Sequence, residues 1–143
     1  MITARDRIPP DTFRQQNEAS NTKCPGEEEP FFAMLGYRRE GEIFEDPAQG
    51  IRGRFLAGQS PRLELLEPLT PGAKGVLGPW LAQGVKLYHL AYLAPRLAPA
   101  IDALRGKRAR LVVAPVPAVA FGGREIAFLM LPNRLLVELI AME

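Results

Sequence analysis

Two stretches of the chain resemble each other, RFLAGQSPRLELLEP at residues 54–68 and AFLMLPNRLLVELIA at residues 127–141. Each has Phe-Leu in an apolar run, then a turn that contains proline, then a leucine-rich run that carries a glutamate. The phenylalanine and the glutamate are 9 positions apart in the first copy (Phe55 and Glu64) and 10 apart in the second. Self-similarity of this kind indicates a duplicated unit. In a chain of 143 residues it predicts two small units that complete one hydrophobic core.

The order of the expected elements supports the duplication. In the first half we expect a strand, a helix and three strands, at residues 13–20, 25–36, 37–45, 51–57 and 62–67. The second half repeats this order at residues 87–93, 97–104, 110–116, 125–131 and 135–140. We therefore expect an α+β fold of two modules, residues 13–69 and 87–143, with a linker at 70–86 and a loose polar tail at 1–12.

The composition is that of an ordinary soluble domain, with 47% hydrophobic and 24% charged residues. The net charge of +2 is nearly even and the basic residues are scattered, which argues against a nucleic-acid partner. The sequence shows no signal peptide and no apolar run long enough to cross a bilayer. A single cysteine, Cys24, excludes an internal disulfide and fits a reducing compartment. We expect a cytoplasmic protein without a membrane partner.

Three polar residues do not fit the apolar strands in which they lie. The only histidine, His89, and the glutamates Glu64 and Glu138 each share a strand face with leucine. A carboxylate buried among aliphatic side chains must be paired, hydrogen-bonded, protonated or bound to a metal. One imidazole and two carboxylates form a reasonable ligand set for a divalent metal. Such an oxygen-rich set favours Mn, Fe, Co or Ni over a thiolate zinc site.

Each of these residues also has a simpler interpretation. A lone histidine in an apolar strand is usually a hydrogen-bonded core residue. Glu64 can pair with Arg62 or another arginine at a sheet edge, and Glu138 lies near the C-terminus, where carboxylates reach water. The repeat adds that the first module should carry a counterpart of the His89 strand near residues 15–19. The side chains there belong to Gln15, Gln16, Asn17 and Glu18, and none of them is a histidine.

Several motifs together resemble the vicinal oxygen chelate superfamily, which includes glyoxalases, bleomycin resistance proteins and extradiol dioxygenases. They are IRGRFLAGQSPRLELLEPLTP, VKLYHLAYLA, PVPAVAFGGREIAFLML and LLVELI, in that order. The stretch FFAMLGYRREGEIFEDPAQGIR is similar to the first helix and second strand of the methylmalonyl-CoA epimerase-like branch. The likeness covers roughly residues 30–141.

This resemblance implies two βαβββ modules whose curled mixed sheets surround a central cavity. It implies metal ligands on the first and last strands of each module, which are Gln15, Glu64, His89 and Glu138 in this sequence. It further implies a divalent metal (Co, Mn, Ni, Fe or Zn), a small-molecule substrate or ligand, and a homodimer.

The function that follows is a metal-dependent isomerase or lyase that removes a proton next to a carbonyl group. It is epimerase-like, with an acyl thioester as one candidate substrate and Glu138 as both ligand and base. The alternative is a non-catalytic protein that binds a small molecule or antibiotic and has a degenerate metal site. Gln15 in place of a histidine favours this alternative, as do the apolar PVPAVAFGG loop and Trp80, which could line a pocket. A third candidate is an accessory domain that serves dimer assembly.

Overall fold

The computed structural model describes residues 14–21, 25–58, 61–70 and 75–142, with side chains from residue 29 onward. The tail expected at residues 1–12 and Cys24 lie outside the described residues. Within the described part of the chain, no helix is long and apolar enough to cross a membrane.

The expected order of elements is confirmed. The first module consists of β1 (Arg14–Asn21), α1 (Pro25–Met34), β2 (Arg38–Asp46), β3 (Ile51–Ala57) and β4 (Arg62–Pro68). A short helix, α2 (Gly78–Ala82), precedes the second module. That module consists of β5 (Leu87–Ala94), α3 (Leu97–Gly106), β6 (Arg110–Pro117), the 3-10 turn η1 (Val119–Phe121), β7 (Glu125–Met130) and β8 (Leu136–Ala141).

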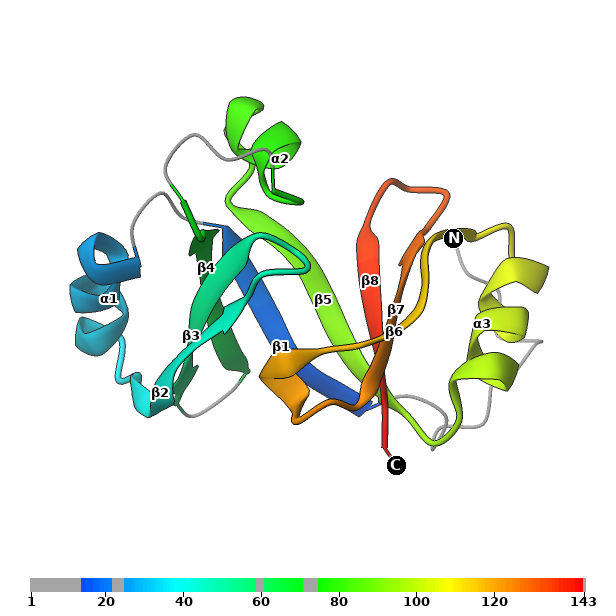
Figure 1. The fold of residues 1–143 in the computed structure, drawn as a ribbon, viewed down its shortest axis with the longest axis horizontal. Helices are drawn as coiled ribbons and strands as arrows, with labels where there is room; N and C mark the ends of the chain where they lie inside the picture. Colours follow the sequence, from blue (N-terminus) through cyan, green and yellow to red (C-terminus); the bar gives the residue numbers. More distant parts are fainter. Residues whose placement is uncertain (1–13, 22–24, 59–60, 71–74, 143) are drawn as a thin grey trace.

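The strands form one continuous sheet in the order β2-β3-β4-β1-β5-β8-β7-β6. Within each module the first strand runs parallel to the last one, and β1 and β5 pair antiparallel where the modules meet. Figure 1 shows β1 and β5 crossing the middle of the molecule, with α1 and α3 at its two outer ends. This is the α+β arrangement of two βαβββ modules that the sequence predicts.

The strand register shows that the two modules are related by an approximate two-fold axis. Ala19 on β1 is the partner of Glu64 on β4, and Ala91 on β5 is the partner of Glu138 on β8. The two glutamates therefore occupy corresponding places in the two halves of the sheet. The duplication read from the sequence thus brings the last strands of both modules next to the central pair of strands.

The β8 strand shows how packing fixes the direction of Glu138. All six residues of β8 are buried, which is typical of a strand covered on both faces. Val137 and Leu139 pack into the core beneath α3, whereas Leu136 and Ile140 belong to the central core between the modules. Because side chains alternate along a strand, Glu138 shares the central face.

Candidate metal centre

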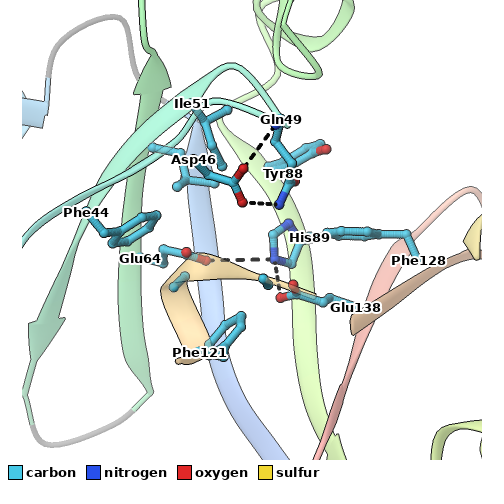
Figure 2. Close-up of a pocket in the computed structure, with 13 residues that line it drawn as sticks. Phe44, Asp46, Gln49, Ile51, Glu64, Tyr88, His89, Phe121, Phe128 and Glu138 are labelled. Atoms are coloured by element: carbon cyan, nitrogen blue, oxygen red, sulfur yellow. Dashed lines mark hydrogen bonds and ion pairs between the residues drawn. The ribbon is translucent and has the colours of Figure 1, made fainter. Parts of the chain in front are cut away.

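Three strands from both modules bring Glu64, His89 and Glu138 together. Their exposed fractions are 3%, 2% and 3%, and one ligand atom from each lies within 4.8 Å of the others. Figure 2 shows the two carboxylates on either side of the same edge of the imidazole ring. The three side chains therefore converge on one point, as the ligands of a metal ion would and as unrelated buried residues would not.

The ligand atoms of the cluster lie at, or within about 1.5 Å of, the separations that a shared ion requires. His89 Nε2 lies 3.0 Å from Glu138 Oε2 and 4.0 Å from Glu64 Oε2. Metal–ligand bonds of about 2.1 Å at right or tetrahedral angles place ligand atoms about 3.0–3.4 Å apart. Two carboxylates without water around them need a compensating positive charge. The donor set, two carboxylate oxygens and one imidazole nitrogen, therefore fits a divalent cation.

The simpler interpretations of the two glutamates do not agree with this geometry. The side chain of Arg62 donates to Glu40 at 2.7 Å, and its guanidinium carbon lies 3.7 Å from the centre of the Phe55 ring. Arg62 is thus engaged at the surface of β4, while Glu64 points to His89. The interpretation of Glu138 as a solvated carboxylate is wrong, because its side chain is 3% exposed and shares a strand face with Leu136 and Ile140 of the central core.

The backbone register bears directly on Gln15. Gln15 pairs with Tyr92, and Asn17 pairs with Ala91, with a register shift between them. Tyr92 packs against the core beneath α3, whereas Ala91 belongs to the central core on the face of His89. The register therefore places position 15 on the face away from the cluster and position 17 on the cluster's face. Gln15 as a ligand stays a prediction, and this register does not support it.

The cluster lines a cavity whose empty space, counted out to the open solvent, is about 320 Å³. Its other described lining residues are Phe44, Asp46, Gln49, Ile51, Leu66, Tyr88, Ala118, Ala120, Phe121 and Phe128. The PVPAVAFGG loop thus lines a pocket, as the sequence suggests. Trp80 is not among these described lining residues, since it packs edge-on against Tyr88 at 5.5 Å between ring centroids.

Asp46 is a cavity carboxylate that the sequence analysis missed. It is 3% exposed, and its two oxygens accept hydrogen bonds of 3.1 Å from the backbone N–H and the side-chain amide of Gln49. In the sequence, Asp46-Pro47 reads as the end of a strand, because Asp-Pro is a common turn start. The signal that could have identified it is the glutamine three residues later, whose amide can close such a turn.

Tyr88 responds to the charge of the cluster. Burial raises the pKa of its phenol to about 12, and the negative charges of Glu138 and Glu64 contribute further to the rise. Its ring lies 4.8 Å from the His89 ring, centroid to centroid. The phenol therefore stays protonated over the whole physiological range and adds no charge to the cavity.

Comparison with known proteins identifies the family and the fold. Residues 26–128 match the model of the Glyoxalase/Bleomycin resistance protein/Dioxygenase superfamily. None of the curated proteins matches the chain in sequence.

Three solved structures show the same fold. The hypothetical protein BH1468 from Bacillus halodurans C-125 has a TM-score of 0.78 at 20% identity, over 92% of this chain and 95% of that one. Methylmalonyl-CoA epimerase from Mycobacterium tuberculosis has a TM-score of 0.72 at 21% identity, over 89% and 86% of the two chains. A Streptomyces coelicolor methylmalonyl-CoA epimerase in complex with 2-nitronate-propionyl-CoA has a TM-score of 0.73 at 22% identity, over 92% and 98%.

Proposed function

Because the chain belongs to the Glyoxalase/Bleomycin resistance protein/Dioxygenase superfamily, we propose that it is a divalent-metal-dependent isomerase or lyase. Its reaction would begin with removal of a proton next to a carbonyl group of a small molecule. The observation that carries this proposal is the buried convergence of Glu64, His89 and Glu138 in the lining of a cavity. Cytoplasmic location and a homodimeric state are part of the same proposal.

The roles of the residues follow from their places. Glu64, His89 and Glu138 would hold the cation, with His89 binding through Nε2, the nitrogen that faces both carboxylates. When bound, the cation supplies a Lewis acid for the substrate carbonyl oxygen. Glu138 would also accept the proton, since a carboxylate can hold a cation with one oxygen and a proton with the other.

Asp46 offers a second place for a proton in the same cavity. Gln49 holds both of its oxygens and so fixes the orientation of the carboxylate. With one carboxylate the enzyme can shift a proton within a substrate, and with two it can remove a proton from one side of a carbon and return one to the other. The second case corresponds to an epimerase. An acyl thioester is one substrate class with a suitably acidic carbon.

Metal binding tests the proposal. Apo protein titrated with Co²⁺ should bind one ion, and Glu64→Gln, His89→Ala and Glu138→Gln should each weaken binding at least about tenfold. Glu45→Gln, at an exposed position of β2, is the matched control and should bind like the wild type. Absence of any bound divalent ion after supplementation would refute the proposal.

The apolar walls of the cavity favour a second candidate function, binding of a small molecule without chemistry. Solvent deuterium exchange separates the two functions. An isomerase or lyase exchanges the proton next to the carbonyl of a bound substrate, and Glu138→Gln abolishes the exchange. A binding protein retains its ligand, needs no metal and exchanges nothing.

A further inference from the structure

The cavity carries several acidic side chains. Among its described lining residues, Asp46, Glu64 and Glu138 carry carboxylates, and none of the described lining residues is a lysine or an arginine. All three carboxylates are buried. An ion in a cavity of this kind interacts strongly with its neighbours, because little water screens the charges.

Arginines of the surrounding sheet are engaged elsewhere. Arg52 pairs with Glu67, Arg54 with Glu29 and Arg62 with Glu40. Arg124 donates to the backbone carbonyl oxygens of Phe121 and Ala141. Recruiting one of these cations to an anionic substrate would break an existing interaction.

A bound divalent cation would neutralise the negative charge of the cavity only in part. In their ionised forms the three carboxylates carry one more negative charge than a divalent cation compensates, since an imidazole that holds a metal is neutral. A neutral substrate does not change this balance. A substrate that brings its own carboxylate adds a second uncompensated negative charge.

The walls of the cavity are aromatic and come from both modules. Phe44 on β2, Phe121 on η1 and Phe128 on β7 line the space next to the cluster. Phe55 lies behind two of these rings, with its centroid 5.5 Å from Phe44 and 5.9 Å from Phe121. A planar or branched apolar group would be enclosed by these rings.

From these features we infer that the substrate is a small neutral carbonyl compound with two adjacent oxygens and an aromatic or branched apolar substituent. Its oxygens would face Glu64, His89 and Glu138, and its apolar part would lie against Phe44, Phe121 and Phe128. A thioester that carries a free carboxylate is disfavoured by the charge of the cavity. This inference rests on the proposed function, because the adjacent oxygens are chosen for a metal centre.

The test uses the full chain loaded with Co²⁺, whose visible absorption reports ligands that reach the metal. The first two probes are 2-hydroxyacetophenone, which is neutral, and mandelate, which has the same ring and adjacent oxygens but a negative charge. Hydroxyacetone, which lacks the ring, is the third. We expect 2-hydroxyacetophenone to bind at least about tenfold more tightly than either of the others, because like charges repel and apolar contact is lost.

Matched variants locate the apolar contact. Phe121→Ala should weaken 2-hydroxyacetophenone about tenfold and leave hydroxyacetone unchanged, while Phe31→Ala, at a residue that is 68% exposed on α1, should change neither. If circular dichroism shows that Phe121→Ala does not fold, Phe44→Leu, which changes a half-buried ring of the same cavity, replaces it in the experiment. Equal or tighter binding of mandelate, or equal binding of hydroxyacetone, would overturn the inference while leaving the proposed function intact. Failure of Co²⁺ to bind would instead overturn both.

Discussion

Tyr88 provides a spectroscopic test of the charge of the cluster. Its pKa is raised from 10.0 to about 12, first by burial and then by the negative charges of Glu138 and Glu64. Its exposed fraction is 8%, so solvent screening is small. The rise amounts to roughly 2.7 kcal/mol of differential stabilisation of the neutral phenol, at about 1.36 kcal/mol per pKa unit. The tyrosinate absorbance of the wild type minus that of Tyr88→Phe isolates this group.

The difference titration should have its midpoint near the raised pKa in the wild type. In Glu138→Gln the midpoint should fall toward 10.0, since one negative charge is gone. It should remain above that value, because burial is the larger cause and is unchanged. A wild-type midpoint near 10.0, or no response to Glu138→Gln, would refute the placement of the phenol beside buried carboxylates.

The same shift predicts how stability depends on pH. Below pH 10 the phenol is neutral in the folded and the unfolded protein, so its contribution is fully present. Between about pH 10 and 12 the unfolded chain releases the proton first, so the free energy of unfolding falls by a total of about 2–3 kcal/mol. Urea unfolding of the wild type and Tyr88→Phe over this range measures the difference, and parallel pH curves for the two proteins would contradict the reasoning.

Three further changes test the fold and the register. Asn17→His should tighten Co²⁺ binding at least about tenfold, because it adds a fourth donor on the strand face of the cluster. Gln15→His lies on the opposite face and should leave the affinity for Co²⁺ unchanged. Equal Co²⁺ affinities of the two variants would disprove the register. Gly53→Ala should lower the free energy of unfolding by about 1–3 kcal/mol, since its Cβ would lie 2.6 Å from a ring carbon of Phe44. Gly78→Ala is the control in the same urea experiment, because a Cβ added at Gly78 meets no neighbouring atom within 4 Å. Leu65→Ala, at a residue with 0% exposure, should cost about 2–5 kcal/mol, and an unchanged urea midpoint would contradict its burial.

The order of elements could be predicted because it is written in local signals. The strand β8 is a nearly continuous apolar run, β4 is rich in leucine, and proline or glycine stands in the turns beside them. Strand ends differ from expectation by one or two residues, for example where β4 continues to Pro68. Such differences at element ends carry little energy, because terminal residues have few ladder partners to lose.

The cluster could be predicted for a different reason. Periodicity alone left Glu64 as an edge residue and Glu138 as a frayed one, and the duplication supplied the relation between them. Their burial depends on tertiary cover, which no local pattern encodes. Asp46 was missed for the same reason, since its exposed fraction of 3% arises only when the β2–β3 turn folds over the cavity.

Gln15 as a ligand stays a prediction, and β1 shows why a strand without a hydrophobic pattern is hard to align from sequence. Counting in steps of two from Ala19 back along β1 puts Asn17 and Gln15 on one face, and either residue has an amide oxygen. The register shift places two residues of β1 against one of β5 between Gln15 and Asn17, which is a β-bulge. A bulge reverses the faces of all residues beyond it, and polar residues on both sides of the bulge give no hydrophobic pattern that would reveal it. Position 17 is also the two-fold counterpart of His89, because it stands two residues before Ala19, as His89 stands two residues before Ala91. The symmetry of the sheet therefore identifies position 17 as the counterpart of His89, whereas the sequence alone limits that counterpart only to residues 15–19.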